Sequence, residues 1–182
     1  MINIIFRLLL TFNATSLLII VFVVQKGYVL SYFFPDLSLF AKLPNVVSYL
    51  IYFFAPVLLT GLSILLSFCL GKDEFKKDEV DSIEHANNSF LPSYLGYFFV
   101  ALSVSNWETL GFVYAMLFVF TFLSQALYFN PLFLVFGYEF YNIKTKNGTA
   151  VFLISRQKYK KPSEVDIPIA RRINNYTFME EC

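Results

Sequence analysis

Four long apolar segments occupy most of the first 130 residues of the chain. They cover residues 8–24, 46–70, 89–105 and 110–129, and none of them contains Asp, Glu, Lys, Arg or His. A helix of about 20 apolar residues can cross a bilayer because it satisfies its backbone hydrogen bonds internally. The pattern predicts an α-helical polytopic membrane protein, with residues 1–130 forming a domain of four transmembrane helices.

Three of the segments have features that affect this prediction. Pro56 and Gly61 lie inside the second segment and predict a kink or a loosened turn. The third is short, so a re-entrant segment is the alternative; a full span is favoured because Trp107 and Tyr114 then lie near one membrane interface. The first follows Arg7 as a signal peptide would, but no small-residue cleavage site follows it, so we expect a retained anchor.

Beyond the fourth segment the pattern changes to that of β-strands. Asn130 and Pro131 end the helix, and the pair Asn147-Gly148 then separates two runs rich in β-branched and aromatic residues. This is the pattern of a β-hairpin with a two-residue type I′ turn. A turn centred there pairs Lys144 with Val151. One face would carry Tyr141, Ile143, Phe152 and Ile154, and the other Phe140, Asn142, Val151 and Leu153.

Apolar residues on both faces mean that this hairpin needs cover. Residues 174–180, "NNYTFME", would supply a third strand. We therefore predict that residues 131–182 form a small cytoplasmic C-terminal β-hairpin or three-stranded sheet with a basic tail, and that a second copy of the chain or a partner protein covers the rest. The candidate partner or oligomer surface consists of Tyr138, Phe140, Tyr141, Ile143, Val151, Phe152, Ile154, Arg156, Lys158, Lys160 and Lys161.

The loops between the apolar segments differ in character. Residues 25–45 are rich in Tyr, Phe and Leu, so this loop either packs on the helices or lies among lipid headgroups and responds to disturbance of the bilayer. Residues 71–88 are polar throughout and predict a solvated linker, with a charged docking surface as the alternative. His85, in this loop, is the only histidine of the chain, which argues against a histidine-based metal site.

Composition and charge agree with a membrane protein. The 182 residues are 57% hydrophobic and 15% charged, against roughly 45–50% and about 25% in soluble domains. Basic residues concentrate on one side of the membrane, which predicts cytoplasmic termini in a multi-pass inner-membrane protein. Near the spans, that side carries Arg7, Lys72, Lys76, Lys77, Lys144 and Lys146, and the other carries only Lys26 and Lys42.

The polar residues within the spans predict helix packing. Ser63, Ser67 and Gly71 recur every fourth residue, as small residues do where helices approach closely. Asn13 and Gln125 would bridge helices; the alternative is that they line the lumen of an oligomeric, holin-like pore that permeabilises the membrane. No cofactor is expected, and we expect no enzyme, because the spans hold no acids and no nucleophile has a recognisable base.

The tail is basic enough to contact anionic headgroups through Arg156, Lys158, Lys160 and Lys161. Direct nucleic-acid binding is not expected, because only Tyr159 interleaves with these cations.

The layout of four apolar segments followed by "NPLFLVFGYEFYNIKTKNGTAVFLISR" and "RRINNYTFMEE" resembles the KwaA family, the small membrane subunit of the Kiwa antiphage defence system. The most distinctive string is "GYEFYNI", then "NG", then "FLIS". The resemblance implies an inner-membrane sensor or scaffold that detects phage attack and works with a cytoplasmic, DNA-acting effector, a KwaB-like protein. Together with the uncovered sheet, it favours a homo-oligomer in contact with membrane lipids.

Overall fold

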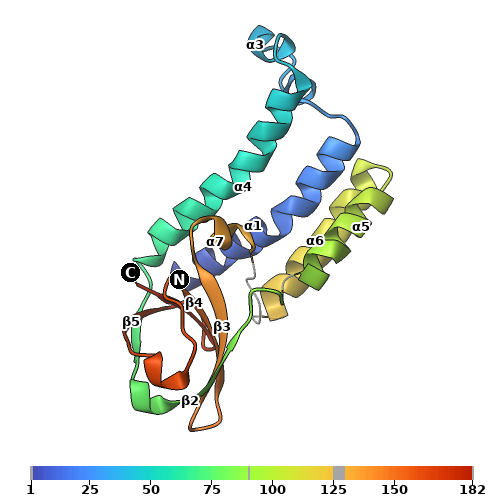
Figure 1. The fold of residues 1–182 in the computed structure, drawn as a ribbon. Helices are drawn as coiled ribbons and strands as arrows, with labels where there is room; N and C mark the ends of the chain where they lie inside the picture. The colour runs from blue at the N-terminus through green and yellow to red at the C-terminus, as the bar shows by residue number, and fades with distance from the viewer. Residues whose placement is uncertain (1, 90, 125–129, 182) are drawn as a thin grey trace.

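The computed structural model describes residues 2–89, 91–124 and 130–181. Helices α1 (Ile2–Gln25), α4 (Asn45–Ser67), α5 (Leu91–Ser103) and α6 (Trp107–Ser124) form one end of the molecule, and a β-sheet forms the other (Figure 1). Within the described residues, α1, α4 and α6 are long and apolar enough to cross a membrane. The structure therefore agrees with the prediction of long apolar helices combined with a β-sheet.

Helix α1 is the centre of the helical part. It contacts α4, α5 and α6, with α4 on one side of it and the α5–α6 pair on the other (Figure 1). The side chains of Leu18 and Phe22 on α1 are fully buried against α5 and the start of α6. Helices α4, α5 and α6 are thus each positioned by contact with α1.

The helix ends differ from the predicted segments for local reasons. α1 begins six residues before residue 8, because Phe6 packs against the sheet. α6 begins at Trp107 because Asn106 caps it: its Oδ1 accepts a hydrogen bond from Thr109 N at 2.8 Å. Residues 125–129 of the predicted fourth segment lie outside the described residues.

Helix α5 is shorter than the third predicted segment. Its 13 residues span about 20 Å, against the roughly 30 Å of a hydrocarbon core. Tyr94, in its first turn, donates its hydroxyl hydrogen to Ala14 O, halfway along α1, and Gln25 at the end of α1 reaches Leu102 O. α5 therefore lies beside the half of α1 that is farther from the sheet.

The sheet has six strands in the order β1-β5-β6-β4-β3-β2. They are β1 (Lys72–Phe75), β2 (Val80–His85), β3 (Glu139–Thr145), β4 (Ala150–Ser155), β5 (Ile167–Arg172) and β6 (Thr177–Glu180), and only β4 and β6 pair in parallel. β1 and β2 are the two edges, yet only residues 76–79, with the short helix η1 (Lys77–Glu79), join them. The edges therefore meet at that end, and the sheet curls into a partial barrel.

The sheet is larger than the predicted three strands. Residues 174–180 do contribute a strand, β6, but residues 167–172 of the predicted basic tail contribute another, β5. Residues 71–88 contribute two more, β1 and β2, and do not form a solvated linker. Both of these strands lie at an edge, where one side of the strand stays unpaired and charged side chains are common. Residues 71–88 were predicted to be a linker because they are rich in acidic residues and lack the apolar alternation of a buried strand.

The register of the β3–β4 hairpin also differs from the predicted one. The loop has three residues, because Thr145 N bonds to Thr149 O at 2.9 Å and Gly148 has φ of +82°. Lys144 consequently pairs with Ala150 and not with Val151. A shift of one residue moves every side chain of β4 to the opposite face. The faces are Tyr141, Ile143, Val151 and Leu153 on one side, and Phe140, Phe152 and Ile154 on the other.

Each face of the sheet has its own core. The inner core lies within the curl and gathers Phe75, Val80, Tyr141, Ile143, Leu153, Tyr159, Val165, Ile167 and Phe178. The junction core lies between the sheet and the helices and includes Phe6, Leu10, Ile64, Phe133, Phe140, Ile154, Ile173 and Met179. The short helix α7 (Leu132–Val135) lies between α4 and the sheet in this second core (Figure 1).

A candidate coupling site between the helices and the sheet

Three polar side chains meet where α1, α4 and the start of α7 come together. Asn13, Thr60 and Asn130 are each at most 1% exposed. The Nδ2 group of Asn130 donates to Thr60 Oγ1 at 3.0 Å, and the side-chain amide of Asn13 lies 2.7 Å from the same oxygen. We call these three residues the polar node.

The amide of Asn13 has one orientation that pairs both of its ends. With its oxygen toward Asn130, it accepts from Asn130 Nδ2 at 3.0 Å and from Thr60 N at 3.1 Å, while its nitrogen donates to Pro56 O at 3.2 Å. We assign this orientation because buried polar groups are almost always paired. The proline in α4 thus provides a carbonyl group that α1 uses.

Asn130 connects the polar node to the sheet. Its Oδ1 accepts a hydrogen bond from Leu132 N at 3.0 Å and so caps α7. Phe133 of α7 is fully buried in the junction core, and its carbonyl oxygen accepts from Tyr138 N, directly before β3. A displacement between α1 and α4 would therefore act on α7 and on the start of β3.

Asn130 was interpreted from the sequence only as a helix stop. The signal for a second role is an Asn-Pro pair inside an otherwise apolar run, since a polar side chain there requires a buried partner. Neither its partner on α4 nor that on α1 can be identified from sequence spacing.

The other candidate packing residues have different environments. Ser63 and Ser67 are buried, but each hydroxyl bonds to its own helix, to Leu59 O and Ile64 O. Gly71 lies beyond the end of α4, is exposed, and has nothing within 4 Å of the position of a Cβ atom, so the stripe of small residues ends at Ser67. Gln125 lies outside the described residues.

A second connection joins α4 to the sheet directly. The side chain of Arg171 on β5 is buried, donates to Leu70 O at 3.0 Å and forms an ion pair with Glu181 at 2.6 Å. The next residue, Arg172, donates its backbone N–H to Gly71 O at 2.8 Å. The end of α4 is therefore held by β5, from a part of the sequence interpreted only as basic tail.

Aromatic residues gather at the opposite end of the helices. Tyr28 stacks on Trp107 with ring centroids 5.6 Å apart and on Tyr32 at 4.2 Å. The Tyr52 hydroxyl of α4 donates to Tyr28 O at 3.1 Å. The loop over residues 26–44, with α2 (Leu30–Phe33) and α3 (Ser38–Ala41), is thus attached to α4 and to the start of α6.

The remainder of that loop stays uncovered. The side chains of Phe34, Leu37 and Leu39 are between 51% and 69% exposed. Tyr28 and Leu30 therefore pack on the helices, whereas Tyr32 and the residues after Phe33 present an apolar surface. Contact of this surface with lipid headgroups stays a prediction.

The seven apolar residues of the candidate partner surface are all buried inside the chain. Part of the cover that the hairpin needs comes from β6, which was predicted, and the rest comes from β2, α7 and the helices, which the prediction did not include. The exposed members of that surface are the four cations, Arg156, Lys158, Lys160 and Lys161. Arg156 lies beside α4 and Phe136, whereas Lys160 and Lys161 precede the short helix η2 (Pro162–Glu164), which contacts η1 and β2.

An acidic side chain joins the tail to β2 and β3. The carboxylate of Glu139 accepts from the Tyr141 hydroxyl at 2.8 Å and lies 3.3 Å from His85 Nε2 and 3.5 Å from Lys158 Nζ. Partial burial alone would raise the pKa of Glu139, but the hydrogen bond from Tyr141 and the nearby cations outweigh it and lower the pKa. Burial and the Glu139 hydrogen bond raise the pKa of Tyr141 to about 12.

Comparison with known proteins gives one match. The model of the family described as anti-phage protein KwaA matches residues 6–179, which is nearly the whole chain. No curated protein matches the chain. No solved structure matches it either.

Proposed function

Because the chain belongs to the KwaA family of anti-phage proteins, we propose that it is the membrane sensor of a phage-defence system. In this role it detects phage attack at the inner membrane and passes the signal to a cytoplasmic, DNA-acting effector of the KwaB type. The proposed role is non-catalytic and needs no cofactor. Membership of the family establishes the defence context, and the sensor role rests on the arrangement of the residues.

The proposal includes a placement in the membrane. The chain crosses the inner membrane four times, with α5 as the short third crossing, and the sheet and both termini lie in the cytoplasm. The uneven distribution of Lys and Arg supports this placement. A homo-oligomer is part of the proposal, because α6 leaves large apolar side chains uncovered, such as Phe112, Val119 and Phe120.

The polar node is the observation that carries the proposal. Asn13, Thr60 and Asn130 link two helices to α7, and α7 leads directly into β3. The sheet is also continuous with α4 through β1 and precedes α5 through β2. A change in helix positions on the lipid side is therefore transmitted to the sheet, where an effector can respond to it.

In this proposal, the loop over residues 26–44 is the part of the protein that detects the disturbance of the membrane. Its exposed part, including Phe34 and Leu39, contacts the outer leaflet, and its packed part holds the outer ends of α4 and α6. A disturbance of the outer leaflet would change how these two ends are held.

The substitution Thr60→Val tests the proposal. It keeps the shape of the side chain but removes the hydroxyl at the centre of the polar node, so we expect loss of phage protection at unchanged expression and membrane insertion. Removing one partner of buried polar groups also lowers stability by roughly 1–2 kcal/mol, which a thermal melt of the detergent-solubilised protein would detect. Plaque counts on cells carrying the defence genes measure protection.

Ser63→Ala is the matched control, one helical turn away. The Ser63 hydroxyl bonds only to Leu59 O of its own helix among the described residues, so protection should remain. Full protection by a well-expressed Thr60→Val variant, or equal loss in both variants, contradicts the proposal.

A measurement of effector binding shows whether the polar node acts in signal transfer or in binding the effector. The wild-type protein and Thr60→Val should both retain a tagged KwaB-like effector in a pull-down from solubilised membranes, since the surface of the sheet is unchanged. Loss of effector binding in Thr60→Val alone would place the polar node in docking and not in signal transfer. The pore hypothesis has less support, because Asn13 is buried and bonded inside the chain.

A further inference from the structure

An apolar groove on the surface of α4 includes one cation among the residues that line it. It has a volume of about 460 Å³ and is lined by Leu58, Gly61, Leu62, Ile64, Leu65, Phe136 and Arg156. This volume is within the range of sites that bind small molecules, roughly 300–1,000 Å³. Only the last of these residues is charged, and it directly follows β4.

Gly61 fits the shape of this groove. A Cβ atom at Gly61 would lie 3.2 Å from Cζ of Phe136, closer than side chains normally approach. The ring of Phe136 can therefore lie directly against the backbone of α4 and form the side of the groove. The sequence suggested that Gly61 loosens α4, whereas its structural effect is this close contact.

The length of the groove along α4 is shorter than the thickness of one leaflet. Leu58 and Leu65 are separated by seven residues of helix, or about 10 Å along α4, and half of a hydrocarbon core is roughly 15 Å. Leu58 and Leu65 are 72% and 65% exposed, so the groove opens outward where lipid would be. Arg156, which lines the groove, directly follows β4, so its charge is supplied from the side of the sheet, where headgroups would be.

The guanidinium of Arg156 is oriented but not neutralised. It stacks over the ring of Tyr138, with Cζ 4.7 Å from the ring centroid. Among the residues whose side chains the structure describes, no carboxylate forms an ion pair with it. The nearest acid on β3, Glu139, instead pairs with His85 and Lys158.

We propose that this groove binds one anionic phospholipid of the cytoplasmic leaflet. An acyl chain lies against Leu58, Leu62 and Leu65, and the phosphate accepts hydrogen bonds from the guanidinium of Arg156, whose planar fork matches phosphate oxygens. The site rests on the membrane placement proposed above but is independent of sensing and of the effector. It assigns to Arg156 alone the headgroup contact that the sequence suggested for four cations.

Retention of phosphatidylglycerol tests the site. The full-length protein is purified from bilayer discs that contain equal amounts of phosphatidylglycerol and phosphatidylcholine, and native mass spectrometry counts the bound lipids. One basic residue contributes about 1 kcal/mol toward an anionic headgroup, so Arg156→Gln should lower phosphatidylglycerol retention roughly 5-fold.

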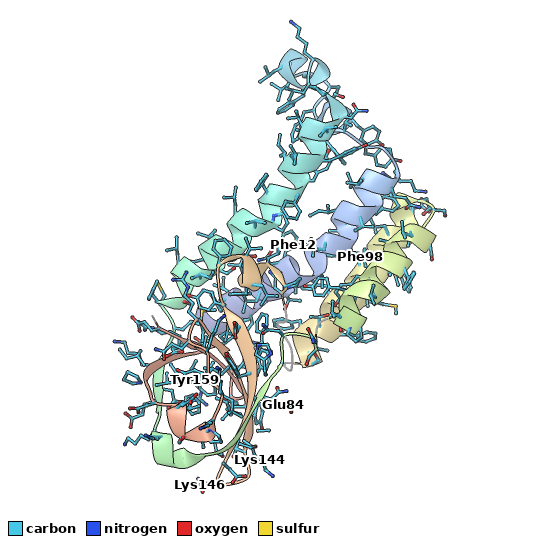
Figure 2. All side chains as sticks on the ribbon, viewed as in Figure 1. Phe12, Glu84, Phe98, Lys144, Lys146 and Tyr159 are labelled. Atoms are coloured by element: carbon cyan, nitrogen blue, oxygen red, sulfur yellow. The ribbon has the colours of Figure 1, made fainter. Side chains whose placement is uncertain are left out.

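Lys144→Gln is the matched control for charge. Lys144 is exposed near the tip of the β3–β4 hairpin, far from the helices (Figure 2), so its loss should leave retention unchanged. Equal losses in Arg156→Gln and Lys144→Gln would mean that net charge alone attracts the lipid, and would overturn the site.

A second variant tests the groove without changing charge. Leu62→Trp fills the groove and should lower retention, whereas Leu95→Trp on the exposed face of α5 should not. Unchanged retention in Leu62→Trp overturns the proposal. A change of oligomeric mass in Arg156→Gln or Leu62→Trp also overturns it, because a second copy of the chain would then be the occupant.

Phage protection is measured separately for the same variants. Loss of lipid with intact protection supports the lipid site and counts against its involvement in sensing. Intact lipid binding in a Thr60→Val variant that has lost protection supports both proposals.

Discussion

At the scale of single residues, the most consequential side chains are buried polar ones that join distant parts of the chain. Thr60 joins Asn13 and Asn130, and Arg171 joins β5 to the end of α4. The sequence identified Asn13 as a packing residue but gave neither partner, because contacts between helices depend on rotations that spacing does not determine. Arg171 lies in the segment that the sequence predicted only as a basic tail, although its side chain is buried.

The pH dependence of stability can be predicted from Glu139. Its pKa in the folded chain lies below the ordinary value of 4.5, so the folded state favours the ionised carboxylate. The resulting stabilisation is present above the unfolded pKa and disappears as the pH falls through the lowered folded value. Glu139→Gln should therefore lower stability at pH 7 by roughly 1 kcal/mol, and this difference should vanish in acid.

Thermal melts at pH 7 and at progressively lower pH measure this difference. Glu74→Gln is the control, because the Glu74–Lys76 pair is exposed on both sides and exposed pairs contribute little. A Glu139→Gln difference that stays constant across the pH range would contradict the assignment of the cluster to an ionised Glu139.

At the scale of elements, the helices were predicted better than the sheet. Long apolar runs in the sequence indicate where α1, α4 and α6 lie, and the three helices are long and apolar enough to cross a bilayer. β1 and β2 were missed because edge strands need few apolar residues, and their pairing partners lie far away in the sequence. The hairpin was located correctly at Asn147-Gly148, but its register was wrong because the loop includes Lys146 as a third residue.

A cysteine pair distinguishes the two registers. Lys144 and Ala150 are directly opposite and both exposed, so the double variant Lys144→Cys, Ala150→Cys should form a disulfide under mild oxidation. Lys144→Cys with Val151→Cys should not, because these two side chains point to opposite faces. Both variants are made with Cys69→Ser and Cys182→Ser, and the shift in gel mobility on reduction is measured; the reverse outcome would restore the two-residue turn.

At the scale of the whole molecule, the number of membrane crossings depends on α5. With four crossings the sheet and both termini lie on one side, and a fluorescent protein that matures only in the cytoplasm should fluoresce when fused after Cys182. An alkaline phosphatase, active only outside the inner membrane, should be inactive at the same position. Active phosphatase and no fluorescence would mean that α5 does not cross.

Membership of the KwaA family agrees with the resemblance found in the sequence. What the sequence could not provide is the mutual arrangement of its parts. The junction core, where Phe6 and Ile64 meet Phe140 and Met179, makes the helices and the sheet one packed body. Deleting residues 138–182 would expose this core, so single substitutions are better tests of effector binding than truncation.

The position of β6 has a consequence for biosynthesis. This strand, near the end of the chain, lies between β4 and β5, and β1 has no neighbour until β5 has formed. While the ribosome is still making α5, α6 and the hairpin, β1 and β2 therefore lack their sheet. Under the proposed function, the surface that an effector would contact is complete only after residues 177–180 are translated. Assembly with an effector would then follow the synthesis of all the described helices.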